Sequence, residues 1–241
     1  MIDQEIILEL TKKYQTGAEN IWREYCQHVF LSYLFQQEES DKLYFKGGTA
    51  LRVIYKSPRF SEDLDFSTSL RYNTITIENI LVKTLTEVER EGIKTQLEEA
   101  KPTTGGYLSI INFDIAGRII PIKIEISERN GEKQGEVAII NNEFTTPYSI
   151  TQFRQKLLIG EKMQALLSRH KPRDFYDLYF LLRSDLIETA DKKKVLSPAL
   201  DLLQKTDINF EHELKQFLPK SHWMIIRDFK HTLEQEIKRY L

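Results

Sequence analysis

The chain has 241 residues, of which 41% are hydrophobic and 29% are charged, which excludes a collagenous or low-complexity protein. No apolar run approaches the roughly 18 residues of a membrane-spanning helix, and the first residues lack the basic start and apolar stretch of a signal peptide. The single cysteine, Cys26, excludes an internal disulfide and a multi-cysteine zinc site. We therefore expect a cytoplasmic protein with no membrane partner and with Cys26 as a buried, inert thiol.

The net charge of −2 conceals an asymmetry between the two parts of the chain. Residues 151–241 carry 17 Lys and Arg against 13 Asp and Glu, a net charge of +4, and residues 1–150 carry −6. A mildly basic part can bind a polyanion, but a solvated helical surface gives the same balance, and charge alone favours the solvated surface.

The predicted elements begin with helices over residues 5–38, where apolar side chains recur at helical spacing. A short strand then ends in the turn Gly47–Gly48, and a helix over residues 49–57 ends before Pro58. Residues 63–68 alternate as a strand that places Asp63 and Asp65 on one face.

Further along, a helix ends near Gly92, and two β-rich runs, 107–117 and 118–128, form a hairpin around Ala116–Gly117. Another strand follows at 136–142, and after Pro147 the pattern predicts helices almost to the end, over 157–170, 173–184, 192–206 and 222–241. The expected fold class is α+β. It has a mixed β-sheet core flanked by N-terminal helices (1–148) and a C-terminal helical bundle (149–241).

The first candidate site is the Asp-x-Asp pair. Two carboxylates on one face of a strand repel each other, whereas Mg²⁺ takes one or two carboxylates plus substrate phosphates as ligands. Upstream, Gly47 and Gly48 permit close approach of a phosphate, and Thr49 begins a helix whose amides would face it. Each feature alone is also compatible with a surface pair or a plain strand-to-helix turn.

A third carboxylate would complete a metal site. In the strand around Glu125, alternation places Ile122, Ile124 and Ile126 on one face and Lys123 and Glu125 on the other. Glu125 could reach the same ions, or it could be an exposed residue paired with Lys123.

The last candidates lie in the helical part. Lys162 and Arg169 share a helix face, and Pro172 ends that helix. Asp174 is a natural N-cap of the next helix, and Asp177, three residues later, is then explained as a carboxylate that faces the helix N-terminus.

These motifs together resemble a known family. Gly-Gly-Thr followed by "RFSEDLDF" resembles the DNA polymerase β-like nucleotidyltransferases. The order of "RFSEDLDF", "IKIEIS", "GEKMQAL" and "RDFYDLYFLL" is similar to the AbiEii/AbiGii nucleotidyltransferase toxins of bacterial abortive-infection systems. The motifs span Lys46 to Leu182, a little over half of the chain.

The resemblance implies a role for each matching residue. Gly47, Gly48, Thr49, Ser61 and Lys162 would bind the nucleotide, and Asp63, Asp65 and Glu125 would bind Mg²⁺, with two ions expected. Asp177 would be the essential C-terminal aspartate. Arg59 and Ser61 match positions that flank the metal motif. The family often has Asp where this chain has the longer Glu125.

The expected function is therefore Mg²⁺-dependent transfer of an NMP from an NTP to a hydroxyl acceptor, RNA and in particular tRNA, by the toxin of a toxin–antitoxin system. A cognate antitoxin is the expected protein partner. Lys171, Arg173 and Lys192–Lys194 would help to hold the acceptor's phosphates. Two alternatives remain: a small-molecule or protein acceptor, and a catalytically silent nucleotide- or partner-binding module.

Overall fold

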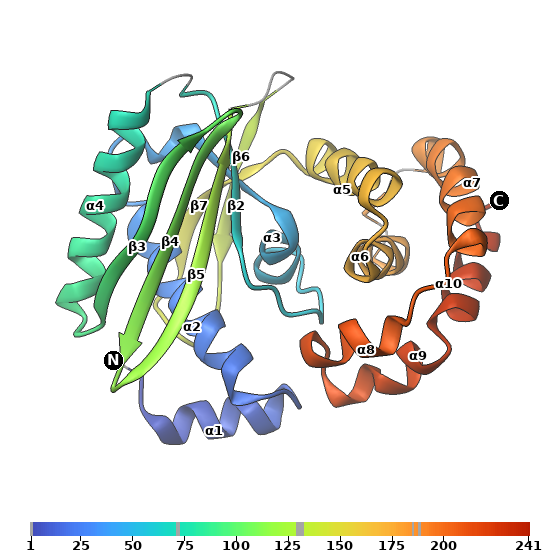
Figure 1. The fold of residues 1–241 in the computed structure, drawn as a ribbon, viewed down its shortest axis with the longest axis horizontal. Helices are drawn as coiled ribbons and strands as arrows, with labels where there is room; N and C mark the ends of the chain where they lie inside the picture. The colour runs from blue at the N-terminus through green and yellow to red at the C-terminus, as the bar shows by residue number, and fades with distance from the viewer. Residues whose placement is uncertain (1, 71–72, 129–132, 185, 188) are drawn as a thin grey trace. The chain divides into compact units, whose positions relative to one another are not determined.

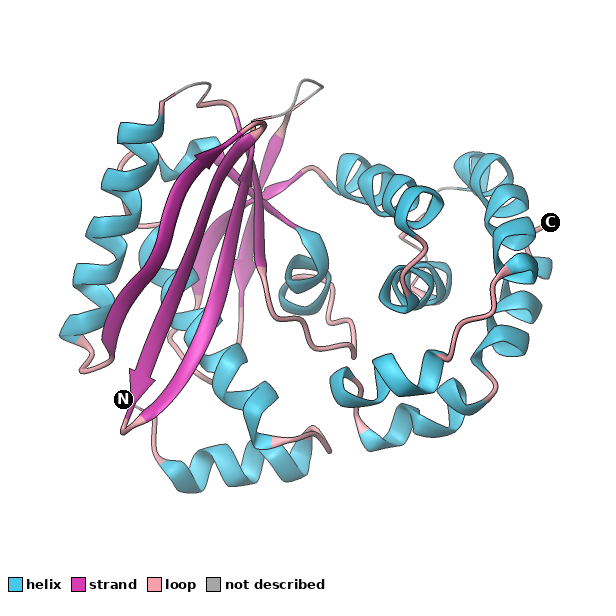
Figure 2. Cartoon of the chain, viewed as in Figure 1, coloured by secondary structure: helices cyan, strands magenta, loops and turns pink. Residues whose placement is uncertain are grey.

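A computed structural model describes residues 2–70, 73–128, 133–184, 186, 187 and 189–241, without the side chains of residues 189–194. The chain divides into two compact units, Met1–Arg154 and Gln155–Leu241. The first contains all strands of the described chain, and the second is helical. We call them the sheet unit and the helical unit. Figures 1 and 2 show their elements.

The sheet unit is built on one mixed sheet of seven strands in the order β3-β4-β5-β2-β1-β7-β6. The pairs β2–β5 and β1–β7 are parallel and the other pairs are antiparallel. The strands are β1 Leu43–Lys46, β2 Leu64–Thr68, β3 Lys94–Thr103, β4 Gly106–Ile115, β5 Arg118–Ser127, β6 Gly135–Ile140 and β7 Tyr148–Phe153.

The helices of the sheet unit are α1 Gln4–Lys13, α2 Ala18–Leu34, α3 Gly47–Val53 and α4 Thr74–Arg90, with a 3₁₀ turn, η1, at Ser40–Lys42. Helices α2 and α4 pack against each other, α2 also against β5 and β7, and α4 against β3 (Figure 1). The core beneath α2 contains the predicted isoleucine face of β5, since Ile122 and Ile124 are fully buried and Ile126 is 2% exposed. Cys26 is also fully buried, and burial raises the pKa of its thiol, as expected for an inert residue.

Two predicted turns have the backbone that their residues favour. Ala116 and Gly117, with φ of 52° and 83°, join β4 and β5 as a hairpin, because two consecutive left-handed residues match the twist of the strands. Gly47, with φ of 83°, is the residue at which β1 passes directly into α3.

The helical unit contains α5 Gln155–Arg169, α6 Pro172–Arg183, α7 Thr189–Lys205, α8 Phe210–Leu214, α9 Trp223–Arg227 and α10 Phe229–Lys238. Two 3₁₀ turns, η2 Lys215–Phe217 and η3 Lys220–His222, lie between α8 and α9. Its core is aromatic: Tyr176 stacks on Phe229 at 5.8 Å between ring centroids, and Phe175 meets Phe210 edge to face at 5.4 Å. No helix in the described part of the chain has the length and apolar character to cross a membrane.

Two predictions from the sequence pattern are wrong. The helical region does not begin after Pro147, because Tyr148–Phe153 form β7, which pairs with both β1 and β6. The helix predicted over 222–241 is also broken, since η3, α9 and α10 succeed one another and Asp228 adopts φ −125°, ψ 51° between the last two. The strand β3 was not among the predicted elements.

Candidate active site

The glycine turn is in direct contact with the side chains of the Asp-x-Asp segment. A Cβ atom on Gly47 would lie only 2.0 Å from Oδ2 of Asp65. A Cβ on Gly48 would lie 2.6 Å from Nη2 of Arg59 and 2.8 Å from Oγ of Ser61. The two positions therefore require glycine for space, and a carboxylate, a guanidinium group and a hydroxyl lie against the backbone of the turn.

The predicted metal carboxylates come from adjacent strands. Asp65 on β2 is the direct Cα partner of Glu125 on β5 in the parallel register, so both side chains project from the same face of the sheet. Asp63 immediately precedes β2. Residues 60 positions apart in sequence are brought side by side only by the pairing of these two strands.

Lys123 joins these carboxylates in one electrostatic cluster. Its Nζ lies 3.0 Å from Oε1 of Glu125. Burial lowers the pKa of Lys123, but the hydrogen bond and charge of Glu125 together with the charges of Asp63 and Asp65 outweigh it, so the pKa is raised. The charges of Asp63, Asp65 and Glu125 therefore act on one and the same cation, the Lys123 ammonium.

The carboxylate of Glu125 has the surroundings of an exposed, paired residue: its side chain is 50% exposed and bonded to Lys123. Within the described residues, no group of three or more His, Cys, Asp or Glu side chains is arranged as a metal site. The chemistry of the donors still fits Mg²⁺, which takes carboxylate oxygens, and the Asp65 carboxylate packs directly against the backbone of Gly47 in the space that a Cβ would occupy. The metal role of Asp63, Asp65 and Glu125 stays a prediction.

The side chain of Thr49 has a structural task. Its hydroxyl, which is fully buried, donates a hydrogen bond to the backbone carbonyl of Asp63. This bond ties the start of α3 to the segment that leads into β2. A contribution of Thr49 to phosphate binding would therefore come from its backbone amide.

In the helical unit, Lys162 on α5 and Asp177 on α6 form a buried ion pair. The Nζ of Lys162 lies 2.8 Å from Oδ2 of Asp177, and the two side chains are 9% and 1% exposed. This contact explains why both residues occur inside apolar helix faces, because a buried charge needs an opposite partner.

Asp174 is not the N-cap of α6 as predicted, although its carboxylate does take part in capping the helix. The N-cap of α6 is Lys171, Pro172 is the first helical residue, and Asp174 lies at the third helical position, where it accepts a hydrogen bond from the Lys171 amide. Asp174 is also held by Arg169 in a two-bond pair of 2.7 and 2.9 Å. Asp177 is thus one turn too far along the helix for the capping explanation.

Comparison with known proteins identifies the family. The model of the family described as nucleotidyl transferase AbiEii toxin, type IV toxin–antitoxin system, matches residues 29–235. The chain belongs to this family. It is therefore a nucleotidyltransferase of the AbiEii type, from a family of toxins that act in type IV toxin–antitoxin systems.

Solved structures agree on the fold. MenT4, a nucleotidyltransferase toxin from Mycobacterium tuberculosis H37Rv, is similar with a TM-score of 0.66 and 14% identity, over 100% of this chain and 93% of that one. JHP933 from Helicobacter pylori is similar with a TM-score of 0.55 and 19% identity, over 93% and 95% of the two chains. A search of curated proteins by sequence finds no match. The expected α+β nucleotidyltransferase fold is confirmed.

Sequence reasoning missed a set of polar residues beneath the site. Asn20, Glu24 and Gln27 lie on α2 and are 8%, 7% and 2% exposed, among the many buried apolar residues of this helix. Their spacing of four and three residues puts them on one helix face. Polar residues that recur at a spacing of four and three within a largely apolar helix are the sequence signal that could have revealed them.

Proposed function

We propose that this AbiEii-type protein transfers an NMP from an NTP to a hydroxyl of an RNA acceptor, with tRNA as the first candidate, in a Mg²⁺-dependent reaction. The observation that carries the proposal is the pairing of Asp65 with Glu125 across β2 and β5, with the Asp65 carboxylate lying on the backbone of Gly47. An acidic strand pair beside a glycine turn is suited to a metal-bound triphosphate.

In this reaction the acceptor's oxygen forms a bond to the α-phosphorus while the bond from that phosphorus to the β-phosphate oxygen breaks. The NMP is joined to the acceptor and pyrophosphate leaves. Bound Mg²⁺, held by Asp63, Asp65 and Glu125, would neutralise phosphate charge and favour loss of the acceptor's proton. The backbone of Gly47, Gly48 and Thr49 would receive the phosphates, and Ser61 would donate a hydrogen bond to them from its position against Gly48.

Lys162 and Asp177 complete the proposed set on the evidence of the sequence motif and of their buried contact. The ammonium of Lys162 would bind the nucleotide phosphates, and Asp177 would orient this ammonium through their 2.8 Å hydrogen bond.

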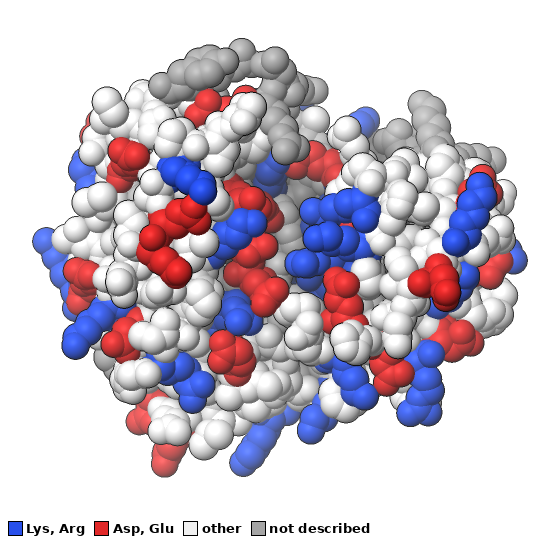
Figure 3. Space-filling view, in the orientation of Figure 1, with Lys and Arg blue, Asp and Glu red and all other residues white. Residues whose placement is uncertain are grey.

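RNA is proposed as the acceptor because of the resemblance to the AbiEii/AbiGii toxins, and the net charge of +4 on residues 151–241 is compatible with a polyanion. Lys171 is exposed at the start of α6, whereas the side chains of Lys192–Lys194 lie outside the described residues. On the face drawn in Figure 3, acidic and basic side chains are interspersed. An RNA contact on that face would therefore use individual cations rather than a broad basic field.

The test is incubation of the purified protein with total RNA and with each NTP labelled in its α-phosphate, in turn, in Mg²⁺ or Mn²⁺. We expect label on an RNA band, and we expect Asp63→Ala to abolish it and to relieve growth inhibition while the protein stays folded. Asp41→Ala is the matched control, since Asp41 is an exposed carboxylate elsewhere in the sheet unit, on η1.

The possible outcomes separate the parts of the proposal. Transfer by Asp63→Ala at the wild-type rate would contradict the assigned site. Label on small molecules or protein but never on RNA would replace the acceptor. Calorimetric NTP binding without turnover would indicate a silent nucleotide-binding module. Presence of a small DNA-binding protein encoded immediately upstream would supply the expected antitoxin.

A further inference from the structure

The loop between α3 and β2 brings three candidate residues to the site: Arg59, Ser61 and Asp63. It contains no helix or strand, so its backbone carbonyls do not accept the regular backbone hydrogen bonds of a secondary-structure element. Side chains satisfy most of these carbonyls instead. The acceptors are the carbonyls of Ser57, Pro58, Phe60, Ser61, Glu62 and Asp63.

Most of the donors come from outside the loop. Gln27 on α2 donates from Nε2 to the carbonyls of Ser61, at 3.0 Å, and Glu62, at 3.1 Å. Arg52 on α3 donates from Nη1 to the carbonyls of Ser57, at 3.1 Å, and Pro58, at 3.4 Å. Gln27 thus fixes the two residues just before Asp63, and Arg52 fixes the beginning of the loop.

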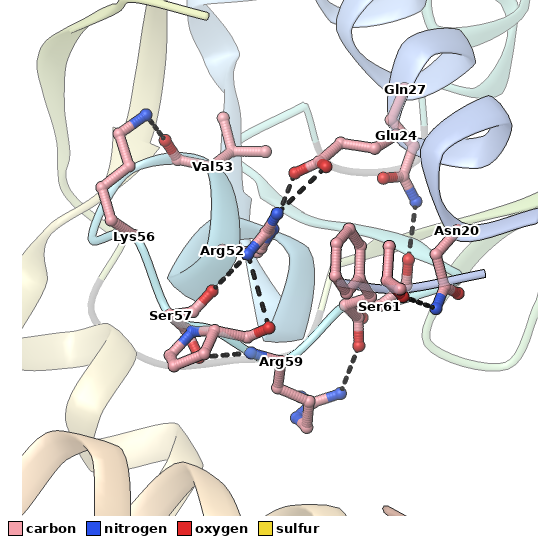
Figure 4. Close-up of polar contacts among 12 residues, drawn as sticks. Asn20, Glu24, Gln27, Arg52, Val53, Lys56, Ser57, Arg59 and Ser61 are labelled. Atoms are coloured by element: carbon pink, nitrogen blue, oxygen red, sulfur yellow. Dashed lines mark hydrogen bonds and ion pairs between the residues drawn. The ribbon is translucent and has the colours of Figure 1, made fainter. Parts of the chain in front are cut away.

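Arg52 is itself held rigidly. Its Nε and Nη2 bind the two carboxylate oxygens of Glu24 at 2.7 and 3.1 Å, and the side chains of Arg52 and Glu24 are 10% and 8% exposed. The guanidinium carbon lies 3.9 Å from the ring centroid of Phe60. Figure 4 shows Arg52 between Glu24 on one side and the loop residue Ser57 on the other. The planar fork of arginine can satisfy both partners at once, which a lysine ammonium cannot do with the same geometry.

Stability alone is a weak explanation for this arrangement. A buried ion pair adds little compared with apolar residues of similar volume, and a stripe of buried polar side chains on α2 displaces hydrophobic contacts. Gln27 nevertheless binds the loop carbonyls directly, and Glu24 binds Arg52, which in turn binds the loop carbonyls. A fully satisfied polar network is suited to fixing one position of an irregular segment.

We propose that Gln27 and Arg52, the latter oriented by Glu24, are positioning residues that hold the 57–63 segment so that Asp63 and Ser61 meet the metal-bound nucleotide. The inference rests on the proposed function of Asp63. A displacement of about 1 Å in a reacting group can cost about 10²-fold in rate, and loss of a residue that supports a metal ligand typically costs about 10- to 100-fold in metal affinity or activity.

The experiment compares Gln27→Met and Arg52→Lys with wild type and with Gln37→Met. Gln37 is the matched control, because it also donates a hydrogen bond to a backbone carbonyl, that of Tyr33, at the far end of α2. Hydrogen–deuterium exchange of the 57–63 segment is measured without metal. Mn²⁺ binding in the presence of a non-hydrolysable NTP analogue is followed by electron paramagnetic resonance, and transfer is assayed against Mn²⁺ concentration.

We expect faster exchange confined to 57–63, an Mn²⁺ affinity about 10-fold weaker and a kcat about 10- to 100-fold lower in both variants at temperatures where they are fully folded, with Gln37→Met unchanged. Mn²⁺ binding and kcat within twofold of wild type would overturn the proposal, as would losses that only follow the folded fraction. If Arg52→Lys does not fold, Gln27→Met decides. If Asp63→Ala is inactive and Gln27→Met transfers NMP at the wild-type rate, the positioning role is rejected and the proposed function stays intact. If Asp63→Ala is itself active, the proposed function is rejected.

Discussion

Replacing Gly47 by alanine tests whether the glycine turn and the carboxylate of Asp65, the proposed metal ligand, form one site. The new Cβ would lie 2.0 Å from Oδ2 of Asp65, while an ordinary non-bonded contact is about 3.5 Å. The carboxylate must therefore move by about 1.5 Å. If Asp65 is a metal ligand as proposed, a shift of this size predicts a loss of about 10²-fold or more in kcat.

The same substitution also strains the backbone, because Gly47 has φ of 83°. Alanine in a left-handed conformation costs about 1–2 kcal/mol. Gly117 provides the matched control: it has the same φ of 83°, at the tip of the β4–β5 hairpin, and a Cβ there would meet no atom within 4 Å. Gly117→Ala should therefore lose similar stability and keep its activity.

The assay combines thermal unfolding with single-turnover transfer of labelled NMP for both variants. We expect melting temperatures lowered by a few degrees in each, about 2–4 °C per kcal/mol for a chain of this size, but an activity loss only in Gly47→Ala. Equal activities in the two variants would refute the reasoning, because the contact with Asp65 would then have no catalytic consequence.

Three further predictions concern stability. Asp177→Asn leaves the buried ammonium of Lys162 without its carboxylate and should cost about 3–5 kcal/mol of unfolding free energy in urea titrations, most of which a second change, Lys162→Met, restores. Gly160→Ala should stabilise α5 by about 0.5–1 kcal/mol in the same assay, since its Cβ would meet nothing within 4 Å. Burial lowers the pKa of His28 to about 3, below the unfolded value near 6.5, so the unfolded state takes up the proton first as the pH falls. Stability due to His28 is therefore unaffected above pH 6.5 and falls below it, by about 2 kcal/mol at pH 5, and His28→Gln should remove this slope.

Each of these predictions has a clear contrary result. A cost below 1 kcal/mol for Asp177→Asn would show that the ion pair is not energetically important. Destabilisation by Gly160→Ala would mean that the α5 backbone depends on glycine. An unchanged pH slope in His28→Gln would assign the acid sensitivity to other groups.

The sequence was sufficient to predict those helices and strands in which the order of apolar and polar side chains indicates which residues are buried. The isoleucines of β5 alternate with Lys123 and Glu125, and the observed strand buries the predicted face. The glycine pair was assigned to a turn because its residue type restricts what the backbone can do, and the structure adds a reason from space: Asp65 and Arg59 lie where side chains would be.

What the sequence did not reveal depends on partners distant in the chain. Strand β3 is an edge strand with mostly exposed residues, so it has no apolar alternation, and β7 carries polar Ser149 and Gln152 among its apolar positions. The buried Gln152 accepts a hydrogen bond from Tyr55 and donates one to Glu136, contacts that local periodicity cannot predict. The same holds for Gln27, whose partners lie more than 30 residues away.

The parallel pairing of β2 with β5 has a consequence for protein synthesis. Asp65 leaves the ribosome about 60 residues before Glu125, and β2 also needs β1, which in turn pairs with β7 at Gln152. Contacts of such long sequence separation form late in folding. A growing chain that ends before β5 therefore lacks the pairing of Asp65 with Glu125 altogether, and the proposed metal site can form only after β5 has been synthesised.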